Sequence, residues 1–529
     1  MIWAALRAGA MPAVVWAALA FSVIPLGQFA FGQIYFSGDA WLAWLYLAGF
    51  GLAALAGTRV VLGTAQISTP LKVLDGWWAA LVLSALVSAA LAIHQWLDLG
   101  LLGLSIVDMP PGARPFANLA QPNQLATLLL LGIAGLIFLF ESRCLRAWPG
   151  VLAALLLISG LVMTGSRSVL LSLVWFCLAY GLLRKRCGLR TSPVVVFGLS
   201  LYYVGLSLLW PALNKVLLLG PDSASALVRM ETPGMRLEFW QAMLDATVRA
   251  PWVGYGWGQV GIASNVVALD HPATHGFYDS AHNLFLDLVL QNGVPVGLIA
   301  GGSLVAWCVW QIRRCRDPLS WSILIGIGFV FSHAMLEYPL KYAFFLLPVG
   351  FLMGTLSAVH PSPLDQQCAK LPPGLVRLVL KTFAAASFLI FATVAFEYPA
   401  WEEEWRQMRY AEVGLVNPAP LPPPTPLLLT QISELIRFAR TEAAPGMSES
   451  QLEWMRHISE RYGYPSSFYR YALALALNGH SAEAGIALRK LCSMDIEKSC
   501  VNAKKNWGKL TQGKYPQLVK TPFPDEPAN

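Results

Sequence analysis

Charged residues are scarce in this chain, and their scarcity excludes an ordinary soluble protein. Asp, Glu, Lys and Arg make up 13% of the 529 residues, against about 25% in soluble domains. Hydrophobic residues make up 56%, and the mean hydropathy is +0.54. This composition predicts an all-α polytopic membrane protein. The net charge of +7 does not indicate a nucleic-acid partner, because the basic residues lie in short loops between apolar runs, where positive charge sets topology.

Three further features are missing from the sequence. No cleavable signal peptide is evident, because the first apolar run begins near Pro12 and is long enough to span a bilayer. No Asp-rich cluster of the kind that holds a divalent cation is present, so neither a metal site nor another cofactor is expected. No two halves of the chain repeat each other in register, as the halves of transporters tend to do.

Long apolar runs are what the chain has in abundance. A helix needs about 20 apolar residues to cross a bilayer, and eleven segments meet this requirement. Trp is also abundant, with 20 residues, as expected for side chains that anchor helices at the water interfaces. The predicted spans are 11–32, 40–62, 76–97, 122–140, 147–164, 168–184, 193–213, 293–312, 319–336, 339–357 and 377–398.

The loops between these spans alternate in charge. Every second loop carries Lys or Arg, and the intervening short loops are poor in both. The positive-inside rule therefore places the N-terminus in the cytoplasm and, after an odd number of spans, the C-terminus outside. The residues of the basic loops are Arg7, Arg59, Lys72, Arg143, Arg146, Arg184, Lys185, Arg186, Arg190, Arg313, Arg314, Arg316, Lys370 and Arg377.

Two domains are expected, with the boundary at the end of the last span. Residues 1–398 form the membrane domain, which includes a large outer loop over residues 214–292. Residues 399–529 lose the apolar runs and show amphipathic helical patterns instead, which predicts a small helical domain outside the membrane.

The tail contains one recognisable pattern and one pair of cysteines. Two helical segments, 471–477 and 481–488, flank a turn at Asn478-Gly479, and the pair is similar to one hairpin of a tetratricopeptide repeat. Cys492 and Cys500 lie in the same tail. An oxidising outer compartment permits a disulfide between them, and two buried thiols are the alternative.

Polar and ionisable side chains gather at the predicted outer ends of the spans. Such groups are costly at the membrane edge, so they are candidates for function. The most prominent is His282-Asn283 at the mouth of a span, followed after nine intervening residues by Gly293. The full set is Gln121, Asn123, Arg167, Arg236, His271, His275, His282, His333, Glu337, Tyr338 and Lys341.

Arginine and histidine at one depth favour a site for a lipid diphosphate. The guanidinium group is a planar, permanently charged fork that matches phosphate oxygens, so Arg167 and Arg236 suit a diphosphate at the headgroup level. The imidazole of His282 is able to accept a proton from a hydroxyl nucleophile. The two arginines would then stabilise the charge that develops on the departing diphosphate.

Each of these candidates also has a purely structural interpretation. Arg167 is able to snorkel to lipid headgroups, and Arg236 to be a solvated loop charge. His282 alternatively caps the following helix or bonds a carbonyl. His333 is able to pair with Glu337 one helical turn further on.

Two remaining patterns favour structure over chemistry. His271 and His275 lack Cys or carboxylate companions at zinc-ligand spacing, so solvated loop residues are expected there. The glycines of Gly254-Tyr-Gly-Trp-Gly258 favour a tight turn, with phosphate binding as the alternative.

Taken together, these elements resemble the O-antigen ligase and polymerase superfamily of bacterial envelope enzymes. Within it, Gln121-Pro-Asn123 is most like the protein O-oligosaccharyltransferases of the PglL type. Those proteins often have His where this chain has Gln124, and the departure argues against a direct role for this residue. The matching elements occur in order over about 110–345 and are Phe116–Ala126, Gly165-Ser-Arg-Ser168, Arg236 to Gly258, His282-Asn283 with Gly293, and Glu337-Tyr-Pro-Leu340.

The resemblance implies a reaction, its partners and a location. It implies transfer of a glycan from undecaprenyl diphosphate to a Ser or Thr hydroxyl of a periplasmic protein such as a pilin, at the bacterial inner membrane and on its periplasmic side. It also implies that His282 is catalytic, that Tyr338 is a further catalytic candidate, and that Arg167 and Arg236 bind the diphosphate. The remaining substrate-binding candidates are Gln121, Asn123, His333, Glu337 and Lys341.

Three alternatives stay open at this point. An O-antigen ligase would use the same chemistry with lipid A-core as the acceptor, and a polymerase would use another lipid-linked glycan. A lipid-binding or transport protein would be a different class altogether. Transporters tend to place polar groups near the membrane midplane, whereas here these groups gather at one face.

Overall fold

The computed structural model describes residues 11–64, 70–100, 103, 106–110, 113–119, 121–217, 236–412, 415, 425–494 and 499–524. No β-strand occurs in these ranges, so the predicted all-α fold is confirmed. The helices are α2 Ala13–Ala30, α3 Ser37–Thr64, α4 Pro70–Trp96, α5 Pro122–Glu141, α6 Ala147–Thr164, α7 Ser168–Cys187, α8 Pro193–Val216, α9 Arg236–Arg249, α10 Val260–Val267, α11 Leu284–Arg314, α12 Pro318–Ala334, η3 Pro339–Lys341, α13 Ala343–Val359, α14 Pro363–Cys368, α15 Pro373–Glu412, α16 Thr430–Arg440, α17 Glu449–Arg461, α18 Pro465–Leu477, α19 Ser481–Ser493, α20 Ser499–Gln512 and η4 Pro516–Lys520.

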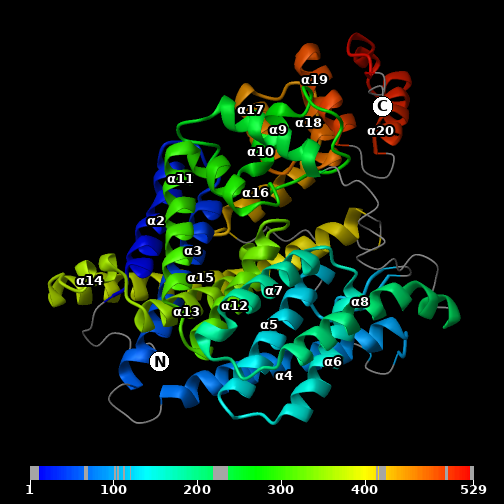
Figure 1. The fold of residues 1–529 in the computed structure, drawn as a ribbon. Helices are drawn as coiled ribbons and strands as arrows, with labels where there is room; N and C mark the ends of the chain where they lie inside the picture. The colour runs from blue at the N-terminus through cyan, green and yellow to red at the C-terminus, as the bar shows by residue number, and fades with distance from the viewer. Residues whose placement is uncertain are drawn as a thin grey trace. The chain divides into compact units, whose positions relative to one another are not determined.

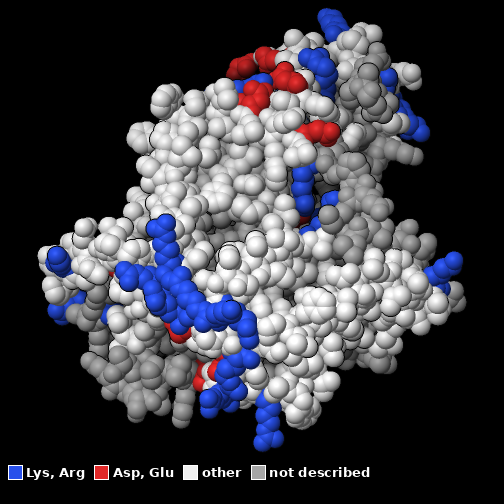
Figure 2. Space-filling view, viewed as in Figure 1, with Lys and Arg blue, Asp and Glu red and all other residues white. Residues whose placement is uncertain are grey.

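The long helices coincide with the predicted spans. In the described part of the chain, nine helices are long and apolar enough to cross a membrane, namely α2 to α8, α11 and α15. The helices α12 and α13 are apolar but have only 17 residues each, so the number of eleven spans stays a prediction. On the face shown in Figure 2, Lys and Arg gather in patches and many of the other described residues carry no charge, as expected of a multi-pass membrane protein.

Two of these helices are longer than the spans predicted from hydropathy. Helix α11 begins at Leu284, although the span was expected from residue 293, and it contains Gly293 in a non-helical conformation with φ 78° and ψ 166°. Helix α15 continues past residue 398 to Glu412, through a polar stretch rich in good helix formers. Hydropathy marks where a helix leaves the membrane, and the helix itself continues beyond that point.

The chain divides into two compact units. Unit 1 takes in the described residues of Met1–Ala18, Gly49–Pro233 and Leu304–Leu380. Unit 2 takes in those of Leu19–Ala48, Gly234–Ser303 and Lys381–Asn529. Four long helices, α2, α3, α11 and α15, contribute residues to both units.

Unit 1 is a helical bundle in which α4, α5, α6, α7 and α12 pack on one another (Figure 1). Its core contains large buried rings, among them those of Trp78, Phe138 and Trp321. Small residues let the helix backbones approach closely, because a Cβ added to Gly132 of α5 would lie 2.4 Å from the Cβ of Ala85 in α4. Close packing through small residues is how membrane helices associate.

One end of unit 1 brings together the loops predicted to lie outside. Gln95, near the end of α4, donates to the carbonyl of Ala117 at 2.8 Å and accepts from its N–H at 2.7 Å, which fixes the segment before α5. Trp96 donates to Asn214, near the end of α8, at 2.8 Å. These contacts place the ends of α4 and α8 next to the start of α5.

The opposite end of unit 1 brings together the loops predicted to be cytoplasmic. Glu141, the last residue of α5, accepts from the N–H of Thr191 at 2.8 Å. The sulfur atoms of Cys187, at the end of α7, and Cys315, after α11, lie 3.3 Å apart. The two ends of the bundle therefore separate the two predicted sets of loops.

Unit 2 contains the tail helices and the predicted hairpin. Helix α18 ends at Leu477, Gly479 turns the chain with φ +92°, and α19 begins at Ser481 (Figure 1). The hairpin prediction is therefore confirmed. A disulfide joins Cys492 and Cys500, as expected for one of the two alternatives considered.

Candidate active site

His282 lies two residues before the start of α11 and has a left-handed backbone conformation with φ +54°. This conformation is uncommon for residues other than glycine, costs about 1–3 kcal/mol, and persists only where its surroundings hold it. Asp287 supplies those surroundings, because its carboxylate accepts from Ala281 N and from Ser280 Oγ, each at 2.7 Å. Ser280 Oγ in turn accepts from His282 N at 3.1 Å. The backbone of His282 is thereby fixed.

Asn283 caps the helix that His282 precedes. Its side-chain oxygen accepts from Phe285 N at 3.1 Å and from Leu286 N at 3.2 Å, as an N-cap side chain does. The capping role considered for His282 therefore belongs to Asn283. The half-buried imidazole of His282 lies edge-on to the Tyr278 ring, with 5.5 Å between the centroids.

Helix α9 connects Arg236 to the loop that carries His282. Trp240 donates from its indole N–H to the carbonyl of Ala281 at 2.8 Å, and the ring of Phe239 contacts that of Tyr278 at 4.6 Å. Because residues four apart share one face of a helix, Arg236 lies on the same face of α9 as Trp240. That face meets the His282 loop.

The glycine-rich stretch is a tight turn, as favoured from the sequence. Gly254, Gly256 and Gly258 have φ values of +67°, +96° and +72°. The turn packs against the break in α11, where the N–H of Tyr255 donates to the carbonyl of Leu290 at 2.8 Å. The turn therefore packs against α11 at Gly293, where the helix is broken.

Two buried glutamines hold the turn to the break. Gln28 of α2 donates to the carbonyl of Gln291 at 2.8 Å and accepts from the N–H of Trp257 at 2.9 Å. Gln291 accepts from the N–H of Gly258 at 3.0 Å. Neither glutamine was singled out from the sequence. An amide within an apolar membrane run was the available signal, because such a group needs a partner there.

The loop preceding His282 also contacts the tail helices within unit 2. The N–H of Thr274 donates to the carbonyl of Ser493 at 3.1 Å. The ring of Phe277 lies 5.4 Å from that of Tyr464. The tail is therefore part of the structure that supports the His282 loop.

The other two histidines of this loop have different surroundings. His271 contacts the carboxylate of Asp245 at 3.1 Å, and Arg249 pairs with the same carboxylate at 2.7 Å. Hydrogen bonds from Arg249 and His271 hold the pKa of Asp245 below its ordinary value. His275 is exposed, as predicted. Among the described residues, no group of three or more His, Cys, Asp or Glu side chains is arranged to hold a metal ion.

Unit 1 brings together three other candidates, at the start of α5 and the end of α12. Asn123 donates to the carboxylate of Glu337 at 3.2 Å. The hydroxyl of Thr127 lies 2.7 Å from Nδ1 of His333, which is 2% exposed. Thr127, one turn after Asn123, was missed, because a threonine in an apolar helix carries no signal by itself.

Gln121, Tyr338 and Lys341, the remaining candidates at this end of unit 1, contact residues close to them in the sequence. Gln121 accepts from the amide of Gln124 at 3.3 Å. The ammonium group of Lys341 lies 5.5 Å above the ring of Tyr338, a cation–π contact within η3 and the residue before it.

Arg167 occupies the turn between α6 and α7, and a second arginine lies at the same turn. Gly165 ends α6 with φ +53°, and Arg167 is the N-cap residue of α7. Arg114 donates to the carbonyl of Thr164 at 2.8 Å and to that of Gly165 at 3.3 Å. Arg114 was missed, although it stands two residues before the Phe116 motif.

The candidates therefore form two groups, one in each unit. Arg236 and His282 belong to unit 2, and the convergence of Arg167 with His282 stays a prediction. The candidates of unit 1 are Gln121, Asn123, Arg167, His333, Glu337, Tyr338 and Lys341.

The chain is similar to known protein families and to two curated enzymes. Residues 152–301 match the family described as O-Antigen ligase, 115–140 match Protein glycosylation ligase, and 321–494 match Virulence factor membrane-bound polymerase, C-terminal. The chain is 27% identical over 481 residues to the General O-oligosaccharyltransferase of Acinetobacter baylyi (strain ATCC 33305 / BD413 / ADP1), covering 88% of this chain and 81% of the relative. It is 30% identical over 331 residues to the ComP-specific O-oligosaccharyltransferase of the same organism, covering 62% of this chain and 59% of the relative.

The fold and these matches define a membrane-bound enzyme of the glycosyltransferase type. Along much of its length the chain is similar to the O-antigen ligase and polymerase superfamily, and the resemblance to the PglL type of O-oligosaccharyltransferase, predicted from the motifs, is confirmed. Similarity to enzymes along the chain favours catalysis over the transport or lipid-binding alternative.

Proposed function

We propose that this enzyme transfers an oligosaccharide from undecaprenyl diphosphate to Ser or Thr hydroxyls of a periplasmic protein such as a pilin. The single observation that carries the proposal is the similarity to a general O-oligosaccharyltransferase over 88% of the chain. The reaction inverts the anomeric carbon and uses no metal ion. The donor diphosphate is bound by arginine, because two guanidinium groups match its oxygens and neutralise its charge.

The chemical step is a single displacement. The acceptor hydroxyl oxygen attacks the anomeric carbon, and the bond from that carbon to the diphosphate oxygen breaks. The hydroxyl proton passes to the imidazole of His282, and undecaprenyl diphosphate leaves with the electron pair, stabilised by Arg167 and Arg236. General-base assistance contributes about 10²–10⁴-fold to such a step. Positioning and stabilisation of the leaving group supply the rest.

The surroundings of His282 support its assignment as the base. Its backbone is held in a strained conformation by the Ser280–Asp287 network. Strain that the surrounding structure maintains is common at active sites. Helix capping is done by Asn283, so the imidazole is not needed for that purpose.

Substrate contacts are assigned to the polar group of unit 1. Asn123, Glu337 and His333 offer amide, carboxylate and imidazole groups to sugar hydroxyls, with Gln121 and Lys341 beside them. Tyr338 is a second candidate for proton transfer. Arg114, at the same turn as Arg167, is a third guanidinium for the diphosphate.

The membrane orientation follows from the charge pattern. The N-terminus is cytoplasmic, residues 214–292 and the domain over 399–529 are periplasmic, and the protein lies in the inner membrane. The separation of the basic loops from the polar group at opposite ends of unit 1 supports this orientation. The disulfide of the tail supports it too, because disulfides persist in the periplasm.

Reconstitution with three acceptors tests this proposal. The purified enzyme is supplied with a lipid-linked glycan and either a pilin, lipid A-core or a second lipid-linked glycan, and the product is identified by mass spectrometry. Glycan on Ser or Thr of the pilin is expected. The matches to ligase and polymerase families favour the other two acceptors as the alternatives, and sugar found only on lipid A-core or on the second glycan contradicts protein glycosylation.

A further inference from the structure

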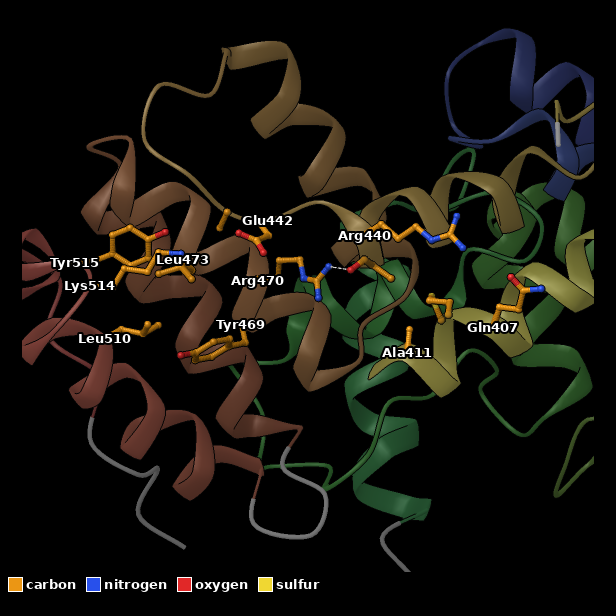
Figure 3. Close-up of a pocket in the computed structure, with 13 residues that line it drawn as sticks. Gln407, Ala411, Arg440, Glu442, Tyr469, Arg470, Leu473, Leu510, Lys514 and Tyr515 are labelled. Carbon is orange, nitrogen blue, oxygen red and sulfur yellow. Dashed lines mark hydrogen bonds between the residues drawn. The ribbon is translucent and has the colours of Figure 1, made fainter. Parts of the chain in front are cut away.

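A groove opens between the end of α15 and the tail helices, all within unit 2 (Figure 3). Its volume is about 610 Å³, which is the size of a site for a small ligand or a short chain segment. Helices α15, α16, α18 and α20 each contribute side chains to its walls. The groove is independent of the residues assigned to the displacement step.

Aliphatic side chains form much of the groove wall. They include Met408 and Ala411 of α15, Leu473 of α18 and Leu510 of α20. Sugar hydroxyls that lost water against such a wall would find no hydrogen-bond partner there, at a cost of about 1–3 kcal/mol for each group. The wall therefore favours apolar side chains as the occupants.

The charged residues of the groove are predominantly basic. Arg440, Arg470 and Lys514 line it together with one carboxylate, Glu442. Glu404 balances the charge of Arg440, so Arg470 and Lys514 against Glu442 leave a formal charge of +1. Two of the cations are held in place. Arg440 pairs with Glu404 at 2.7 Å, and Arg470 donates to the carbonyl of Phe438 at 2.7 Å. Figure 3 shows the further bond from Arg470 to the carbonyl of Ala439. Fixed positive charges favour an acidic partner.

Tyr469 contributes a buried hydroxyl to the groove. The hydroxyl oxygen is buried and has no hydrogen-bond partner among the described residues. Burial raises the pKa of Tyr469 to about 12, so the group keeps its proton and remains a donor at neutral pH. A buried donor without a partner costs free energy that a bound acceptor would recover. A peptide carbonyl is such an acceptor.

We propose that this groove binds a short segment of the protein acceptor in which an acidic side chain stands next to apolar side chains. The identity of the partner as an acceptor protein rests on the proposed function. The apolar groups lie along α15, α18 and α20, the acidic group faces Lys514, and a backbone carbonyl accepts from Tyr469. The tail thereby selects the protein to which glycan is transferred.

Direct binding to the full-length enzyme in nanodiscs tests the groove without requiring transfer. The probe is a fluorescent 12-residue peptide that alternates Asp with Leu, and a second peptide has Lys in place of Asp. Lys514→Glu should weaken binding of the acidic peptide about tenfold and strengthen binding of the basic one. Lys505→Glu, the same charge change on an exposed residue of α20 outside the groove, is the matched control and should change neither.

A second variant separates binding from folding. Tyr469→Phe removes only the unsatisfied hydroxyl, so the melting temperature should stay equal or rise while the affinity for the acidic peptide falls about fivefold. Equal affinities of wild type and both groove variants would overturn the assignment, as would competition by a soluble oligosaccharide. An enzyme that binds the peptide but transfers no glycan to protein contradicts the proposed function alone. An enzyme that glycosylates protein yet ignores the peptide contradicts the groove alone.

Discussion

Gly254 and Gly293 lie so close that neither has room for a side chain. A Cβ on Gly254 would stand 2.6 Å from the N atom of Gly293, and a Cβ on Gly293 would stand 2.3 Å from the carbonyl oxygen of Trp252. Both residues also have positive φ, at +67° and +78°. The glycine that follows His282-Asn283 is therefore required by the contact between the break in α11 and the glycine-rich turn.

Gly293→Ala should disrupt this contact and with it the active site. The methyl group would meet backbone atoms that cannot move aside, and the positive φ adds about 1–3 kcal/mol of strain. We expect loss of glycan transfer and a lower melting temperature in detergent. Gly302→Ala, on the same helix with nothing within 4 Å of the added atom, is the control and should behave as wild type. Full activity of Gly293→Ala would contradict the close approach.

Asp287→Asn should reduce transfer without preventing membrane insertion. One of the two carboxylate oxygens becomes an amide that cannot accept, so the hydrogen bond to Ala281 N or to Ser280 is lost. The loss costs about 1–3 kcal/mol, and the initial rate of glycan transfer should fall about tenfold or more. Asp245→Asn changes a carboxylate on α9 that holds His271 and Arg249, and should leave the rate nearly unchanged. Equal rates for the two variants would show that Asp287 does not position His282.

Arg114→Lys should weaken binding of the lipid-linked donor. A lysine has the charge but not the planar fork of Arg114, which reaches the carbonyls of Thr164 and Gly165 beside Arg167. The KM for the donor should rise several-fold, with a smaller change in kcat, in a transfer assay at varied donor concentration. Arg143→Lys, in an exposed loop after α5, is the control. An unchanged donor KM would remove Arg114 from the diphosphate site.

The disulfide between Cys492 and Cys500 provides a test of orientation. If the tail is periplasmic, both cysteines are oxidised in normal cells and reduced in cells without the periplasmic thiol oxidase. Mass-tagging of free thiols before and after reduction measures this. The exposed Cys144, in a loop predicted to be cytoplasmic, should be free in both strains. Reduced Cys492 and Cys500 in normal cells would indicate the opposite orientation.

Hydropathy and charge predicted much of the fold. Nine long apolar helices and the hairpin around Gly479 followed from patterns that depend on nearby residues only. The tail disulfide is one of the two alternatives that the sequence left open. The extension of α11 back to Leu284 did not follow, because that turn is half polar and Gly293 interrupts the apolar run. The length and polarity of a segment do not reveal that a helix such as α11 continues through a break such as that at Gly293.

Candidate site residues could be named from the sequence, but the residues that support them could not. His282, Arg236, Asn123 and Glu337 are residues whose chemistry marks them in the sequence. The contact of Asn123 with Glu337 was not predicted. Gln28 and Asp287 act through hydrogen bonds to backbone atoms, in the case of Gln28 to segments more than 200 residues away. The partners of Gln28 depend on the tertiary fold and leave no spacing to read, whereas those of Asp287 lie six and seven residues away but include a backbone N–H, which any residue carries.

The most direct test is the rate of glycan transfer to a protein acceptor by wild type and His282→Asn. Asparagine tolerates positive φ. This variant therefore removes the imidazole and adds no strain to the backbone, which has φ +54° at this position. We predict normal insertion, an unchanged melting temperature and a rate at least about 10²-fold lower. A His282→Asn enzyme that transfers glycan at nearly the wild-type rate would contradict the role of His282 as the base.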